Sequence, residues 1–167
     1  MENRKLIGDW RFRIQRMQTA HYQAAMKLDK QRVWFGSVSV VFSSIVGSAI
    51  FVEISEATRM DTKLGIALGL MSITAASLSG LQTFFNFGER AENHRKAGAK
   101  HAELRMELDL LFEQPADESI EKEILEDFRI RWAEMNSLYP TVPVGVWRSV
   151  YERYATEEPE MTKRNPA

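Results

Sequence analysis

Two long uncharged stretches constrain the fold of this chain more than any other feature. Residues 33–52 carry no charge over twenty positions, and residues 64–87 carry none over twenty-four. At a rise of about 1.5 Å per residue, either stretch can cross the roughly 30 Å hydrocarbon core of a bilayer as a helix. Only the eleven residues 53–63 separate the two stretches. The sequence therefore predicts an all-α integral membrane protein built on a two-helix transmembrane hairpin.

The average composition hides this pattern, because the apolar residues are concentrated in two blocks and the charges in the rest of the chain. The formal net charge is −1, so the whole chain is not expected to bind a polyanion such as nucleic acid. There is no cysteine. This excludes a disulfide framework, a thiolate nucleophile and a cysteine-based zinc site.

Basic residues flank the two spans unevenly. Eight lie before the first span and five follow soon after the second: Arg4, Lys5, Arg11, Arg13, Arg16, Lys27, Lys30 and Arg32, then Arg90, Arg95, Lys96, Lys100 and Arg105. The connecting loop contains only Arg59 and Lys63. Because basic residues favour the cytoplasmic side, both termini are expected in the cytoplasm and the loop outside, in a multi-pass topology.

The N-terminal arm has apolar positions with a period of 3.5 residues, which is typical of a helix that packs against another helix. They are Ile7, Trp10, Ile14, Met17, His21, Ala24 and Leu28. A similar spacing follows the second span, at Ala97, His101, Leu104, Leu108 and Leu111. We expect each arm to continue its span as one helix and the two arms to pack together. We also assign six positions to an oligomer seam: Ile7, Trp10, Ile14, Met17, His21 and Leu28.

Three regions are expected along the chain. Residues 1–115 form the transmembrane hairpin with its cytoplasmic coiled arms, in an oligomeric protein. Residues 116–155 form a small cytoplasmic helical module, with a helix over about 119–137 and an aromatic helix over 144–154. Residues 156–167 contain two prolines and many charges and are expected to be disordered.

One side of the second span carries small and polar residues at helical spacing. The positions are Ser72, Ala76, Ser79, Thr83 and Asn86, with Gln82 adjacent. Two interpretations are open. Small residues and hydroxyls can let helices approach closely and bond to one another. Alternatively, several copies assemble and these six residues line a water-filled pore, since a single hairpin cannot enclose a channel.

No pattern in the sequence indicates an enzyme, a cofactor or a metal centre. A Gly-rich phosphate loop and a GxSxG motif are both absent. His94 and His101 are seven residues apart and can share one helix face, but a metal site would need further ligands, such as Glu103 or Asp109, at matching geometry. A place in the seam or on the surface is therefore favoured for the histidines.

The segment QTFFNFGERAENHRKAGA at residues 82–99 carries a more specific signal. With His21-Tyr22 and the Trp34-Phe35-Gly36 start of the first span, it resembles the SLATT family of bacterial two-transmembrane effectors associated with nucleotide-signalling conflict systems. The motif is Asn-Phe-x-Glu-Arg-Ala-x-x-His-Arg-x-Ala-Gly, and the resemblance covers roughly residues 10–115.

The resemblance implies a pore-forming or membrane-disrupting antiphage effector in the bacterial inner membrane. A sensor protein or a nucleotide second messenger would trigger it, and the result would be membrane permeabilisation and abortive infection. The matching positions are expected to form a gate where the second span leaves the bilayer: Asn86, Glu89, Arg90, His94, Arg95 and Gly98. The alternative is a membrane-anchored structural or adaptor protein that oligomerises and recruits a cytoplasmic partner.

Overall fold

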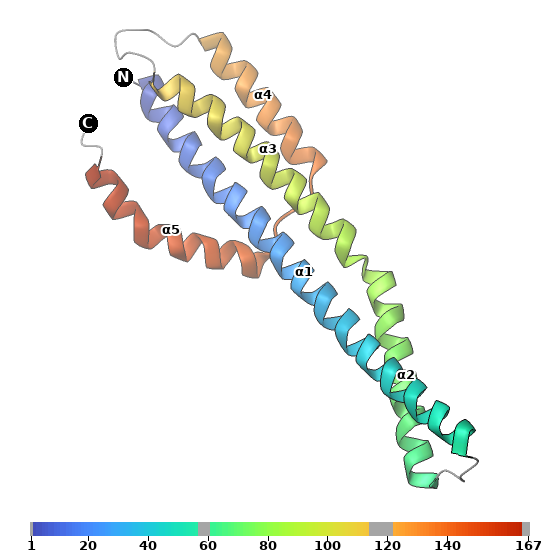
Figure 1. Cartoon of the computed structure of the whole chain (residues 1–167). Helices are drawn as coiled ribbons and strands as arrows, with labels where there is room; N and C mark the ends of the chain where they lie inside the picture. Colours follow the sequence, from blue (N-terminus) through green and yellow to red (C-terminus); the bar gives the residue numbers. More distant parts are fainter. Residues whose placement is uncertain (1, 57–60, 114–121, 165–167) are drawn as a thin grey trace. The chain divides into compact units, whose positions relative to one another are not determined.

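The structure is a computed structural model that describes residues 2–56, 61–113 and 122–164 (Figure 1). In these residues the chain is helical, without strands, which confirms the all-α class. The helices are α1 (Glu2–Glu56), α2 (Thr62–Phe85), α3 (Phe87–Glu113), α4 (Lys122–Leu138) and α5 (Val144–Arg164). The chain divides into two compact units: an arm unit, Met1–Met26 with Ala91–Ala167, and a hairpin unit, Lys27–Arg90.

Helix α1 runs without interruption from the N-terminal arm through the first apolar stretch. This confirms the predicted continuity, and its physical reason is the lack of proline and of a turn cluster between residues 2 and 56. Within the part of the chain that the structure describes, two helices are long and apolar enough to cross a membrane. Only 6% and 11% of their most apolar windows are buried within the chain, whereas the core helix of a soluble protein would be mostly buried.

In the hairpin unit, α1 and α2 pack through a narrow set of residues. Leu68 and Ala75 are the buried residues of α2, and Ser39 is buried on α1. The hydroxyl of Ser39 donates a hydrogen bond to the backbone carbonyl of Ala75, at 3.1 Å. Small side chains at this crossing let the two backbones come close together, as is common between transmembrane helices.

The expected continuation of the second span into its arm is wrong at one residue. Asn86 has φ 45° and ψ 47°, a left-handed conformation that ends α2, and α3 begins at Phe87. Asparagine is one of the few residues that adopts this conformation at modest cost. The break therefore needs neither glycine nor proline.

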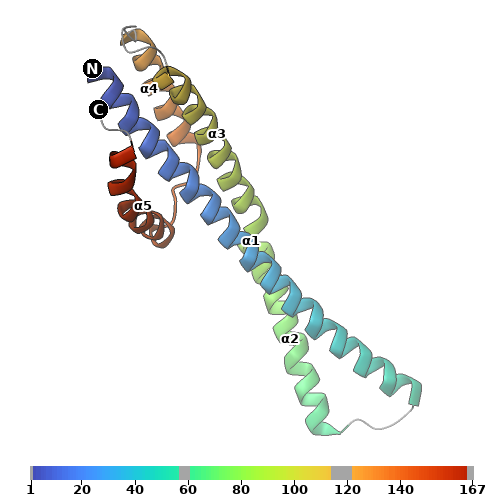
Figure 2. The same ribbon diagram turned by 60° about the vertical axis from the view of Figure 1, so that its left-hand side comes forward.

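The core of the arm unit joins α1, α3 and α4, and α4 lies alongside α3 in both views (Figures 1 and 2). Its buried residues are Ile7, Ile14, Leu104, Leu108, Leu125, Phe128 and Met135. Trp10 stacks on Phe128 with ring centroids 5.6 Å apart. The predicted packing of the two arms is thereby confirmed. Ile7 and Ile14, which the sequence analysis assigned to an oligomer seam, are covered completely by α3 and α4 of the same chain, so packing within the chain accounts for their burial.

Helix α5 adds a second cluster to the arm unit. Ala20, Val150 and Tyr154 are buried there, with Phe12, Val142 and Trp147 packed around them. Helices α4 and α5 thus pack on the arms and belong to the same compact unit, instead of forming the separate module expected for residues 116–155.

The expected disorder after residue 155 is also corrected, because α5 continues to Arg164. The added residues combine glutamate, methionine and lysine, which favour helices, with Pro159, which does not. The expected start of the first module helix, near residue 119, lies outside the described residues, as do residues 165–167.

Candidate functional site

The polar stripe of α2 lies outside the contact between α1 and α2. Ser72, Ala76, Ser79 and Thr83 are all exposed. The side of α2 that meets α1 carries Leu68, Ala75 and Gln82, which repeat every seven residues. Because each residue turns the helix by about 100°, the centre of the stripe lies about 70° around the helix from the centre of this contact. The hairpin therefore leaves the stripe uncovered.

Gln82 does not belong to the exposed stripe. Its side-chain amide donates to the backbone carbonyl of Arg32 on α1, at 2.8 Å. A Cβ atom added at Gly36 would lie 3.1 Å from the Gln82 amide nitrogen. In this structure Gln82, which the sequence analysis assigned to a pore lining, links the two helices of the hairpin.

Two threonines of α2 have the same local bonding on different sides of the helix. Thr83 donates its hydroxyl proton to the carbonyl of Ser79 at 3.1 Å, and Thr74 donates to the carbonyl of Leu70 at 2.8 Å. The two threonines are nine residues apart, about two and a half turns, so they point in opposite directions. These bonds satisfy each donor and leave the hydroxyl oxygens of Thr83 and Thr74 able to accept.

The first half of the expected gate forms the junction between α2 and α3. The side-chain amide of Asn86 donates to the carboxylate of Glu89, and the backbone amide of Arg90 donates to the carbonyl of Asn86 at 3.1 Å. Asn86 is therefore the C-cap of α2, and its backbone carbonyl accepts a hydrogen bond from the first turn of α3. Asn86, Glu89 and Arg90 are exposed.

The second half of the expected gate is mostly buried within the arm unit. His94 is 4% exposed and contacts His21 of α1. Gly98 is buried beneath the ring of Tyr22, and a Cβ atom added at Gly98 would lie 3.1 Å from that ring. Arg95 is exposed and pairs with Glu92 at 2.7 Å. His94 and Gly98 thus have packing roles in the arm unit. Gly98 in particular permits the close approach of α1.

All three histidines of the chain meet in one buried cluster, which we call the histidine cluster: His21, His94 and His101. The Nδ1 atoms of His21 and His94 are 3.0 Å apart. The rings of His21 and His101 stack with centroids 5.2 Å apart. Sequence reasoning placed His21 and His101 on the seams of the two arms but did not bring them together. The signal was present, since both seams must share one interface once the arms pack.

Burial of the cluster disfavours the charged imidazolium. Burial first, and then the charges that His101 and His94 can carry, lower the pKa of His21 from 6.5 to about 4. Burial also lowers the pKa of His101, partly opposed by the hydrogen bond to the Ala97 carbonyl. Across residues 2–56, 61–113 and 122–164, no group of three or more histidine, aspartate or glutamate side chains is arranged to hold a metal ion.

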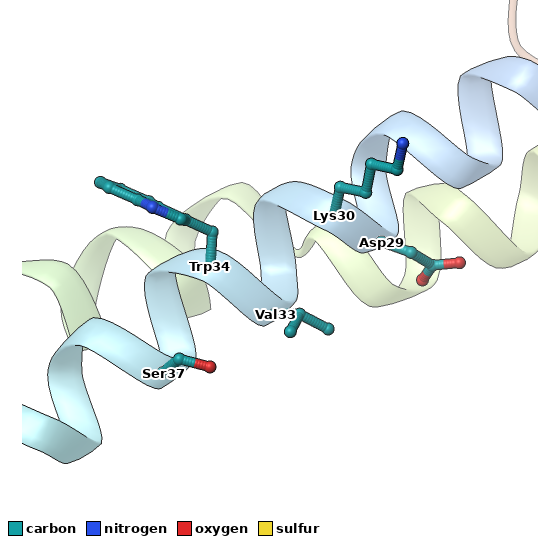
Figure 3. Close-up of a pocket in the computed structure, with 5 residues that line it drawn as sticks. All are labelled: Asp29, Lys30, Val33, Trp34 and Ser37. Carbon is teal, nitrogen blue, oxygen red and sulfur yellow. The ribbon is translucent and has the colours of Figure 1, made fainter.

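A shallow hollow lies on α1 near the start of its apolar stretch (Figure 3). Its lining comes from successive turns of one helix: Asp29, Lys30, Val33, Trp34 and Ser37. Val33 and Trp34 are each 60% exposed, and Trp34 extends away from the helix in Figure 3. A half-exposed tryptophan beside charged residues is typical of the membrane–water interface.

Comparison of the chain with protein-family models, curated proteins and solved structures finds no match. The resemblance to the SLATT family consequently stays a prediction from the sequence motif.

Proposed function

We propose that this chain inserts into a membrane as a helical hairpin and assembles into an oligomer that permeabilises it. The observation that carries the proposal is the polar stripe of α2, formed by Ser72, Ala76, Ser79 and Thr83. It lies on an apolar helix and is exposed outside the hairpin's own contact. Polar groups facing lipid are unfavourable, so a second copy of the chain or water is the better neighbour for this side.

Membrane insertion is supported by the exposed apolar side chains of the hairpin unit. They include Val40, Val41, Ile45, Phe51, Ile66, Leu70, Ile73 and Phe84. Monomeric soluble proteins rarely expose apolar surface on this scale, whereas lipid tails cover it naturally. The excess of basic residues outside the loop supports an orientation with both termini in the cytoplasm.

Pore formation requires several copies, because two helices cannot enclose a channel. In the proposed oligomer, α2 turns its stripe toward a central water-filled path and its opposite side toward lipid, where the hydroxyl of Thr74 is bonded to the carbonyl of Leu70. The hydroxyl oxygens of Ser79 and Thr83 then accept hydrogen bonds from water. Neither apolar stretch contains a charged residue, so strong ion selectivity is not part of the proposal.

The biological setting proposed for this activity is defence of a bacterial cell against phage. It rests on the motif at residues 86–98, which resembles the SLATT family. A sensor protein or a nucleotide second messenger is the proposed trigger, and loss of the inner membrane barrier is the proposed outcome. The chain acts in this proposal without enzymatic activity.

The test is ion flux through the full chain reconstituted into liposomes, comparing Thr83→Leu with Thr74→Leu. These substitutions remove the same hydroxyl and the same local hydrogen bond from opposite sides of α2. Thr83→Leu is expected to reduce flux severalfold because it places an apolar group on the pore wall, while Thr74→Leu leaves flux unchanged. Ser79→Leu and Ser77→Leu form a second matched pair with the same expectation.

Two outcomes contradict the proposal. Equal reduction by Thr83→Leu and Thr74→Leu would show that the stripe does not line the path. The second outcome has two parts: the folded oligomer conducts no ions in liposomes, and cells that express the chain together with its trigger system keep their membrane potential. This outcome would favour the adaptor function. In that alternative the spans only anchor the arm unit.

A further inference from the structure

We propose that the histidine cluster is a pH-sensitive contact that holds α1 to α3 in the arm unit. The contact weakens when its imidazoles take up protons. The proposal concerns the arm unit alone and does not depend on pore formation. It starts from a topological fact: His21 lies on α1, whereas His94 and His101 lie on α3, more than seventy residues later.

The contact between His21 and His94 depends on an unprotonated nitrogen. Their Nδ1 atoms are 3.0 Å apart, a distance at which one Nδ1–H donates and the other Nδ1 accepts through its lone pair. If both imidazoles carry two protons, neither Nδ1 has a lone pair. The hydrogen bond is then replaced by two like charges facing each other in a buried site.

The position of His101 adds a second constraint. Its Nδ1 lies 2.8 Å from the carbonyl of Ala97, which can only accept, so Nδ1 carries the proton and Nε2 is the basic nitrogen. Nε2 is buried and has no hydrogen-bond partner. Protonating it would create a charge beneath the stacked ring of His21 with no acceptor to receive the new N–H.

No carboxylate is among the groups that shift the pKa of His21, so a charge on His21 itself has no counter-ion there. The groups whose charges act on His21 are His101 and His94. The nearby acids of α3 are engaged at the surface, Glu92 with Arg95 and Glu103 with Lys100. Other charged or titratable groups of the arm unit are paired with one another as well: Arg11 with Asp109, Arg131 with Glu107, and Tyr154 with Thr19.

The direction of the pH effect follows from the depressed pKa. His21 has a pKa of about 4 in the packed chain against 6.5 when free, so the unpacked state binds the proton more tightly. The contribution of His21 to the stability of the α1–α3 packing is therefore complete above pH 6.5 and decreases as the pH falls toward 4. Each pH unit across this range shifts the packing equilibrium by up to about tenfold, which gives about tenfold between pH 7.5 and 5.5.

The first experiment is an NMR titration of the full chain labelled with 15N-histidine, in detergent or nanodiscs. The only three histidines all belong to the cluster, so every imidazole signal reports on it. We expect the imidazoles of His21 and His101 not to titrate near pH 6.5 in the packed state, and slow exchange to a second set of signals as the pH falls. Three freely titrating imidazoles with no second set would overturn the proposal.

The second experiment compares the wild type with a variant by amide hydrogen exchange in α1 and α3. The exchange rates are corrected for the effect of pH on the intrinsic rate. Protection in the wild type is expected to fall about tenfold between pH 7.5 and 5.5, and His21→Gln is expected to lose most of this fall. Asp109→Asn is the control, because it removes another α1–α3 link, the pair with Arg11, and leaves the cluster intact. An equal fall in folded His21→Gln overturns the proposal. If His21→Gln does not fold, the wild-type titration decides.

Discussion

The side-chain amide of Gln82 on α2 donates a hydrogen bond to the backbone carbonyl of Arg32 on α1, at 2.8 Å. The link crosses the hairpin at the position of Gly36, whose missing side chain leaves room for the amide. A polar residue that lies one position from the exposed stripe in sequence is therefore turned inward. In an apolar environment such a bond contributes on the order of 1 kcal/mol to helix association.

Filling the space at Gly36 is expected to weaken the hairpin. Gly36→Leu forces a side chain against the Gln82 amide, and such overpacking costs about 1–3 kcal/mol. The control is Gly47→Leu on the same helix, where an added Cβ meets nothing within 4 Å. Unfolding in mixed micelles measures both. Equal stability of the two variants would show that Gly36 does not lie against Gln82.

The left-handed residue between α2 and α3 gives a second prediction. Asn86→Ala is expected to lower stability by about 1 kcal/mol relative to Asn86→Gly, because alanine is disfavoured at φ 45° and glycine is not. Both variants lose the hydrogen bond to Glu89, so their difference isolates the backbone. Thermal unfolding of the reconstituted protein measures it. An alanine variant as stable as the glycine variant would mean that α2 and α3 are one continuous helix.

A charge at the core of the arm unit is expected to unfold that unit. Ile14 is fully buried between helices of the same chain, and Ile14→Glu would bury a carboxylate without a partner, at a cost of about 3–5 kcal/mol. Met26→Glu is the control, because Met26 is 56% exposed on the same helix. Limited proteolysis reports on the folding of the unit. A smaller oligomer with a folded, protected arm unit would instead restore Ile14 to an oligomer seam.

The apolar periodicity of the arms predicted which residues would be buried but not against which partner. Ile7, Ile14, Leu104 and Leu108 all lie at seam positions of the sequence and all are buried. A period of 3.5 residues is the same whether the neighbouring helix comes from the same chain or from another copy. Only the three-dimensional structure distinguishes the two, and it shows contacts within the chain.

The candidate site was predictable in its pattern and not in its details. The stripe from Ser72 to Thr83 follows from helical spacing alone, and the structure leaves it exposed. Gln82 was misassigned because adjacency in sequence corresponds to about 100° around a helix. The break at Asn86 has only a weak sequence signal, since asparagine also occurs inside helices. The histidine cluster depends on the register of α1 against α3, which spacing within either arm does not determine.

Solvent access to the stripe is the most direct test of the proposed pore. The chain has no cysteine, so Thr83→Cys and Thr74→Cys each introduce a single thiol without background. A charged, water-soluble thiol reagent is added to the conducting oligomer in a planar bilayer. The proposed pore predicts that the reagent rapidly reduces the current through Thr83→Cys and leaves Thr74→Cys unaffected. Modification of neither thiol, or of both at equal rates, would contradict a water-filled path lined by this side of α2.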